Sequence, residues 1–160
     1  MQIFSFPPIV GPAPSILILG TMPGIPSLKV QQYYGFKGNH FWKLMFELLE
    51  TPFSENYEDR VMLLKDHHIA LWDVLKACVR ESSRDSAIQK EEPNDLKTFL
   101  SEHPSLKAIF FNGKMAARFF KHRIGTVPLL QFTLPSSSSA NTRFRYKDKK
   151  NAWGEISKYL

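Results

Sequence analysis

The sequence has very little cysteine, no long hydrophobic run and few acidic residues in its last third. Its 160 residues include one cysteine, Cys78. A single thiol excludes an internal disulfide and an iron–sulfur cluster, which needs about four thiolates. Cys78 lies in an apolar stretch, so we expect it to be a small buried hydrophobe. No apolar run approaches the roughly 20 residues that span a bilayer. No positively charged segment precedes the first apolar residues, so we expect a cytoplasmic protein without a signal peptide.

The charge is distributed unevenly along the chain, and the formal net charge is +6. Residues 112–160 contain ten Lys or Arg and two acidic residues, a net charge of +8. Residues 1–111 contain eleven basic and thirteen acidic residues, a net charge of −2. Such asymmetry is typical of a surface that binds a polyanion. A basic face that only keeps the protein in solution would leave the same pattern, and charge alone does not separate the two.

Apolar runs alternate with segments of helical periodicity along the chain, which predicts an α/β fold. The predicted strands are 15–20, 69–73, 107–111 and 127–133, and the predicted helices are 39–49, 57–66, 93–100, 114–123 and 148–159. Asn39 is the expected N-cap of the first helix, and Asn94 or Asp95 of the third. The Pro-rich start, residues 81–92 and residues 136–141 are expected to be irregular. We therefore expect one domain, 1–160, with three αβα layers and a central, mostly parallel four-stranded sheet.

Glycines, prolines and polar residues follow each predicted strand. The strands end at GTMPG, at LWD, at FFNG and at LPSSSSAN. The carboxyl ends of parallel strands meet at one edge of a sheet, and ligands bind there. The sequence therefore predicts a binding site at this edge.

Three motifs carry a chemical signal, and each is weak alone. GTMPG permits close approach to a ligand, and no GK[ST] follows that would make it a phosphate-binding P-loop. In QQYYGFKGNHFW the tyrosines could stack on a nucleobase, although Tyr33 and Tyr34 packed on the core, with Asn39 as a helix cap, are the simpler explanation of this motif alone. The serines of LPSSSSAN could donate to phosphate oxygens or form an exposed loop. The five basic residues within 143–150 favour phosphate contact.

Taken in order, GTMPG, YYG…NHFW and LPSSSSAN resemble motifs of the uracil-DNA glycosylase superfamily, and particularly its hypoxanthine-DNA glycosylase class. The segments IALWDVLKACVRESSRDSAI and FFNGKMAARFF also resemble that class, so the resemblance covers nearly the whole chain. It implies a monofunctional hydrolase of base excision repair that binds double-stranded DNA. The enzyme would flip out a deaminated base, with hypoxanthine from deoxyinosine as the expected substrate, and leave an abasic site. The alternative is a uracil-specific or mismatch-specific glycosylase of the same superfamily.

The resemblance also implies roles for individual residues. Asn39 is the expected catalytic residue, which positions water and orients the base. Tyr34 stacks on the extruded base and Asn112 reads its edge. Gly20 lines the base site together with Met22, which stands where mismatch-specific relatives have Asn. The residues expected to contact DNA are Ser136, Ser137, Ser138, Ser139, Asn141, Arg143 and Lys147.

The chain departs from the class at two places. Phe36-Lys37-Gly38 replaces an expected His-Pro-Arg, and Ser137 and Ser139 stand in the last loop where a Thr and a Pro are expected. Leu134 stands where other branches of the superfamily carry a His. We expect no cofactor and no metal, because the adjacent His67 and His68 would point in different directions. We expect a monomer, because flipping one base requires no symmetry.

Two other functions fit parts of the pattern. The absence of a carboxylate in the first motif allows a damaged-DNA-binding protein without catalysis. A small-molecule enzyme on a flavodoxin-like sheet would need an acidic metal-binding cluster at the strand ends. Only Asp73 is evident there.

Overall fold

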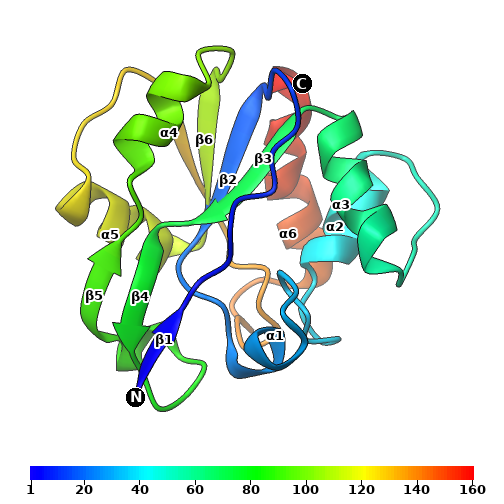
Figure 1. The fold of residues 1–160 in the computed structure, drawn as a ribbon. Coiled ribbons are helices and arrows are strands. Elements are labelled where there is room, and N and C mark those ends of the chain that lie inside the picture. The colour runs from blue at the N-terminus through cyan, green and yellow to red at the C-terminus, as the bar shows by residue number, and fades with distance from the viewer.

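The computed structural model describes all residues, 1–160, and contains the predicted parallel sheet (Figure 1). Its strands are β2 (Ile16–Gly20), β3 (Ile69–Asp73), β6 (Ala108–Asn112) and β7 (Leu130–Leu134). They pair in the order β3-β2-β6-β7, and every pairing is parallel. β2 and β6 are buried along their whole length. This explains their uninterrupted apolar sequences, because helices cover both faces of the sheet.

Helices form a layer on each face of this sheet. Figure 1 shows α2 (Phe41–Leu48), α3 (Tyr57–Asp66) and α6 (Tyr146–Trp153) on one side and α4 (Leu96–Glu102) and α5 (Lys114–Arg123) on the other. Along β2, Ile16 and Ile18 face the first helix layer, whereas Leu17 and Leu19 face the second. This alternation is the period-2 geometry of a strand. The predicted three-layer αβα architecture is therefore confirmed.

A second sheet, which the sequence did not predict, lies beside the layer of α4 and α5. It is antiparallel and pairs β1 (Gln2–Phe4), β4 (Leu75–Val79) and β5 (Gln89–Pro93) in the order β1-β4-β5. The prediction of irregular structure was wrong for residues 2–4 and 89–92, and Pro93, which was predicted to open a helix, ends β5. β5 is polar and partly exposed, and its pairing with β4 contains register shifts, so it lacks the alternation that identifies a strand. Cys78 is buried in β4, as expected.

Several element boundaries differ from the prediction. Helix α1 (Ile25–Val30) was not predicted, and β7 begins at Leu130 instead of residue 127. The last helix begins at Tyr146, ends at Trp153, and continues as a 3-10 segment, Gly154–Tyr159. None of the helices has both the length and the apolar character of a membrane-spanning segment.

Two helix starts show how polar side chains set the boundaries. Asp95 caps α4 as predicted, because its carboxylate accepts the Thr98 N–H at 3.2 Å. The N-cap position of α2 is His40 and not the predicted Asn39. Asn39 nevertheless accepts the Phe41 N–H at 2.9 Å from one residue further back. This bond holds the Asn39 side chain at the start of the helix.

Helix α3 provides a test of the core. Leu64 is fully buried in the core between the sheet and the first helix layer, whereas Met62 on the same helix is 50% exposed. Leu64→Ala should lower the free energy of unfolding by about 2–5 kcal/mol, because it leaves a cavity. Met62→Ala should change it by less than about 0.5 kcal/mol. Urea unfolding of both variants measures these values, and equal effects would contradict the packing described here.

Candidate active site

A cavity of about 350 Å³ opens at the carboxyl ends of the parallel strands, where the sequence predicted a site. Its volume lies within the usual range for pockets that hold small organic ligands. It is lined by the 20–24 turn after β2, the 33–39 loop before α2, the end of β3, the β4–β5 connection, the end of β6 and the 136–140 loop after β7. The elements of the sheet therefore supply the walls from positions far apart in the sequence.

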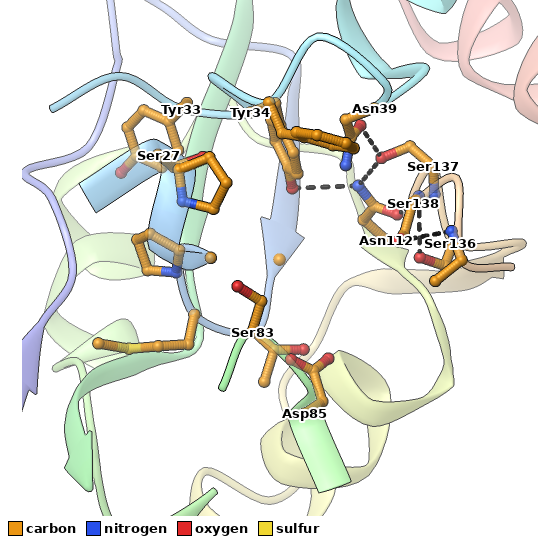
Figure 2. A pocket seen from close by; sticks show the side chains of 18 of the residues that line it. Ser27, Tyr33, Tyr34, Asn39, Ser83, Asp85, Asn112, Ser136, Ser137 and Ser138 are labelled. Atoms are coloured by element: carbon orange, nitrogen blue, oxygen red, sulfur yellow. Dashed lines mark hydrogen bonds between the residues drawn. The ribbon is translucent and has the colours of Figure 1, made fainter. Parts of the chain in front are cut away.

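A chain of hydrogen bonds joins three of these walls (Figure 2). The Asn112 Nδ2 donates to the Ser137 Oγ at 2.9 Å, and the Ser137 N–H donates back to the Asn112 Oδ1 at 2.9 Å. The Ser137 hydroxyl donates to the Asn39 Oδ1 at 2.8 Å. Asn112 and Ser137 are 8% and 1% exposed. A network that is buried and hydrogen-bonded in this way fixes its members in one arrangement.

The orientation of the Asn39 amide follows from these contacts. Its Oδ1 accepts both the Phe41 N–H and the Ser137 hydroxyl. A backbone N–H can be accepted only by the oxygen, so the amide cannot be flipped. The Nδ2 group has no protein partner and lies on the cavity side, where Asn39 lines the wall. Asn39 therefore presents a hydrogen-bond donor to the cavity.

Tyr34 forms an aromatic wall beside this network. Its ring stacks on Phe41 with centroids 4.2 Å apart, and its hydroxyl accepts from the Asn112 Nδ2 at 3.1 Å. Its backbone is left-handed, with φ 52°. A Cβ at Gly20 would lie 2.6 Å from the Tyr34 hydroxyl, so only glycine leaves room for it. Burial and the nearby Asp73 raise the pKa of Tyr34 above its ordinary value, which keeps the phenol neutral.

Another part of the cavity wall carries two carboxyl groups, Asp73 and Asp85. Asp73 is 3% exposed, and its Oδ2 has no hydrogen-bond partner. Burial, together with the charge of Asp85, raises the pKa of Asp73 to about 7. Burial also raises the pKa of Asp85. Two further buried side chains near this wall lack partners for some atoms, the Thr21 Oγ1 and the Arg80 Nε and Nη1.

The loop of serines is supported from beneath by Lys149. This lysine is 1% exposed, and its Nζ donates to the Ser138 carbonyl at 3.0 Å and lies 3.2 Å from the His40 Nδ1. The ammonium needs an acceptor there, so His40 is neutral. Burial and the neighbouring lysine charges lower the pKa of His40. Asn141 donates to the Ser136 carbonyl at 3.1 Å and closes the loop.

Comparisons with known proteins agree with this geometry. The sequence profile of the uracil DNA glycosylase superfamily matches residues 7–157. The chain belongs to this superfamily. Two similar proteins named hypoxanthine DNA glycosylase come from Methanosarcina barkeri (strain Fusaro / DSM 804) and Methanosarcina acetivorans. Each is 39% identical to this chain; the alignments cover 96% of both chains for the first, and 94% of this chain and 95% of the relative for the second.

A solved structure extends the comparison to three dimensions. The solution NMR structure of a Methanosarcina acetivorans protein, proposed to be a uracil DNA glycosylase, superimposes with a TM-score of 0.83. It is 38% identical to this chain, and the match covers 98% of this chain and 96% of that one. The fold described above is therefore the fold of this superfamily.

In the structure of our chain, most of the predicted site residues lie together. Those that line the cavity are Gly20, Met22, Tyr34, Asn39, Asn112, Ser136, Ser137, Ser138 and Ser139. The predicted DNA-contacting residues Asn141, Arg143 and Lys147 lie outside the cavity, and Arg143 and Lys147 are exposed. Ser137 differs from the other serines because its hydroxyl is buried inside the network.

Several residues of the site were missed in the sequence. Ser83 and Asp85 lie in the polar segment expected to be a loop, and only the pairing of β4 with β5 brings that segment to the cavity. The buried Lys149 lies in a run of charged residues that indicates a solvated helix face. The sequence identified Asp73 only as an acidic residue at a strand end. Its place at the end of a strand was the one indication that it lines the site. No three His, Cys, Asp or Glu side chains converge to hold a metal ion.

Asp73 makes the stability of the protein depend on pH in an unusual direction. Its pKa rises from 3.8 to about 7 on folding, so between these values the folded state binds more protons than the unfolded state. The free energy of unfolding should therefore fall as pH rises through this window. In Asp73→Asn this loss should be absent, so the variant should gain roughly 2–4 kcal/mol on the wild type between pH 4 and pH 8.

Denaturant unfolding at several pH values measures this difference. Asp95→Asn is a control of opposite sign, because hydrogen bonds from Thr98 lower the pKa of Asp95. Its contribution to stability should be present at neutral pH and should be lost as pH falls below the ordinary value of 3.8. Parallel pH profiles for the wild type and Asp73→Asn would contradict the burial of an ionisable Asp73.

Proposed function

We propose that this chain is a monofunctional DNA glycosylase that removes a deaminated base, hypoxanthine from deoxyinosine, and leaves an abasic site in double-stranded DNA. The observation that carries the proposal is the fixed Asn39 amide in a cavity of about 350 Å³. The names of the two Methanosarcina relatives support the choice of base. The enzyme works as a single-domain monomer in the cytoplasm, since extruding one base requires no second subunit.

The substrate base enters the cavity after extrusion from the duplex. A base inside the helix is out of reach of the active-site groups, and a deaminated base pairs weakly, which lowers the cost of extraction. In the cavity the base lies beside the Tyr34 ring, which is already held by its stacking on Phe41. Gly20 and Met22 line the same wall without blocking it. The site is therefore preorganised before DNA arrives.

Asn39 acts by donating a hydrogen bond from its Nδ2. As the bond between sugar and base breaks, positive charge develops on the sugar and negative charge on the departing base. A fixed N–H donor stabilises that developing negative charge or holds the attacking water in position. Both lone pairs of the Asn39 Oδ1 are already used, so this residue does not remove the proton from water.

Asn112 reads the base by its amide donor. Its Oδ1 is engaged by the Ser137 N–H, and one Nδ2 hydrogen is bonded to the Tyr34 hydroxyl at 3.1 Å. A base carbonyl oxygen that replaces that phenol as the acceptor keeps the Asn112 amide hydrogen-bonded. The amide would then donate to the O6 of hypoxanthine.

The strand that carries the base is held by the loop after β7 and by the basic residues that follow it. Ser136, Ser138 and Ser139 line the rim of the cavity and offer hydroxyl groups to phosphate oxygens. Ser137 and Asn141 hold the shape of this loop. The exposed Arg143 and Lys147 supply the charge that neutralises phosphates.

The first prediction from this mechanism concerns base excision by Asn39 variants. Asn39→Ala should lower the single-turnover rate on a deoxyinosine duplex by about 10²–10³, the usual cost of removing one preorganised donor. Asn39→Asp is the matched variant, because it keeps an acceptor for the Phe41 N–H but loses the Nδ2 donor. It should be as inactive as Asn39→Ala and better folded. Alkali cleavage of the abasic product reports the rate.

Substrate panels decide between the related activities. Duplexes with a single deoxyinosine, a single uracil or normal bases are incubated with the wild type. Cleavage only at uracil would keep the superfamily and overturn the substrate. Binding without cleavage at any base would support a non-catalytic protein that binds damaged DNA. Near-normal excision by a folded Asn39→Ala would contradict the mechanism.

The second prediction concerns salt dependence. Arg143→Ala and Lys147→Ala should each weaken DNA binding without regard to base, and each should reduce the slope of log affinity against log salt by about one. Lys107→Ala is the matched control, because this exposed lysine directly precedes β6, at the opposite edge of the sheet from the cavity. Equilibrium binding at several salt concentrations measures the slopes. Equal slopes for all three variants would contradict phosphate contacts by Arg143 and Lys147.

A further inference from the structure

The loop after β7 leaves one backbone donor free at the rim of the cavity. The neighbouring N–H groups in this loop all have acceptors within the protein, at 2.9–3.2 Å; they belong to Ser137, Ser138, Ala140 and Asn141. The N–H of Ser139 has no acceptor within the protein. Ser139 is exposed and lines the cavity, so its N–H can donate a hydrogen bond to a ligand at the rim.

The direction of this N–H is set by the carbonyl of the same peptide group. The Ser138 carbonyl accepts the Lys149 Nζ at 3.0 Å and the Asn141 N–H at 3.0 Å, which occupies both of its lone pairs. The peptide bond is trans, so its N–H points away from its carbonyl. The carbonyl is turned inward, toward a lysine that is 1% exposed. The Ser139 N–H is therefore turned outward.

The Lys149 ammonium is a buried positive charge without an anionic partner. It contacts the Ser138 carbonyl and the His40 Nδ1, which are both neutral, and it belongs to none of the ion pairs of the chain. The carboxylate that α2 directs toward α6, Glu47, is already paired with Lys150 at 3.2 Å. Burial accordingly lowers the pKa of Lys149. Since an ammonium is costly to bury without an anion, an apolar side chain would serve stability alone better.

We propose that Lys149 is a positioning residue that completes a binding site for one DNA phosphate at the rim of the cavity. Its ammonium holds the Ser138 carbonyl inward, and the Ser139 N–H then donates to an oxygen of the phosphate, as backbone N–H groups commonly do in protein–DNA contacts. The phosphate supplies the negative charge that the buried ammonium lacks, and the low polarity around Lys149 strengthens their attraction. This proposal rests on the proposed function only in taking DNA as the ligand.

The position of Asn39 does not depend on this ammonium. The Asn39 Oδ1 is held by the Phe41 N–H and by the Ser137 hydroxyl, and the Ser137 N–H is held in turn by Asn112. None of these bonds involves Lys149. Loss of the ammonium should therefore weaken DNA binding more than it lowers the rate of excision in the bound complex.

Lys149→Met tests the charge, because methionine has a similar shape and no ammonium. The variant should unfold at the same urea concentration as the wild type or at a higher one, because a buried charge is removed. It should bind a duplex roughly 10–100-fold more weakly, because a hydrogen bond supported by a charge is lost. A lysine with a purely structural role would instead lower stability when replaced. Lys150→Met is the matched control, since it removes the same charge from the next residue, whose side chain is 48% exposed and paired with Glu47.

The phosphate is located by replacing single phosphates of the duplex with neutral methylphosphonates. The duplex carries a tetrahydrofuran abasic analogue in place of deoxyinosine, so that equilibrium binding is measured without bond cleavage. In the wild type, one replacement beside the analogue should weaken binding by roughly tenfold or more. In Lys149→Met the same replacement should have little further effect, because the two changes remove one interaction. Lys150→Met should keep the wild-type pattern. In NMR spectra of the wild type, the Ser139 amide proton should shift downfield when the duplex is added.

The proposal would be overturned by a folded Lys149→Met that binds the duplex as tightly as the wild type, or by the same methylphosphonate pattern in both proteins. If Lys149→Met does not fold, the Ser139 amide proton of the wild type decides: a downfield shift supports the proposal, and an unchanged position overturns it. Excision of deoxyinosine is measured in parallel. A wild type that shows the binding pattern but excises no base would refute the proposed function and support the role of Lys149. Excision without the pattern would do the reverse, and a wild type that binds no duplex would overturn both.

Discussion

The hydrogen-bond chain Asn112–Ser137–Asn39 is the interaction on which the rest of the site depends. Its members come from the end of β6, the loop after β7 and the residue before the α2 cap. The parallel sheet alone does not fix these loops; the buried amide and hydroxyl groups do, since each would be costly to leave unpaired. Because the Asn39 oxygen is used in this chain and in starting α2, its nitrogen is directed to the cavity. The same Asn39 side chain therefore starts α2, fixes the loop after β7 and presents a donor to the cavity.

The cavity combines a wall of fixed donors with a wall of poorly solvated carboxyl groups. The Asn112 amide is paired with Tyr34 and Ser137, whereas the Asn39 Nδ2 faces the cavity without a partner. The Asp73 Oδ2 and the Thr21 Oγ1 are buried without partners. Such unpaired groups reduce stability, and they concentrate at functional sites where a ligand completes them. Gly20 makes the arrangement possible, because any side chain there would collide with Tyr34 and Asp73. Of these unpaired groups, the Asn39 Nδ2 is the one on the cavity side, where a bound ligand can reach it.

The sequence predicted what depends on local apolar patterns. The strands around Ile18 and Phe110 were found because burial on both faces requires continuous hydrophobic residues. The ordered motifs located Tyr34, Asn39 and Asn112. The antiparallel sheet was missed because β5 is polar and irregularly paired, and with it Asp85 was missed. Lys149 was missed because its burial depends on a distant carbonyl group and His40, which no local pattern reveals.

The central claim is that this cavity receives the extruded base beside Asn39. It is tested most directly by a crystal structure of the protein bound to a duplex that carries a non-cleavable 2′-fluoro analogue of deoxyinosine. The account predicts the hypoxanthine ring in the cavity beside Tyr34, with its carbonyl edge toward Asn112 and the Asn39 Nδ2 within hydrogen-bonding distance of the base or of a water at the sugar. A hypoxanthine that remains stacked in the duplex, or that occupies another surface while the cavity stays empty, would contradict it.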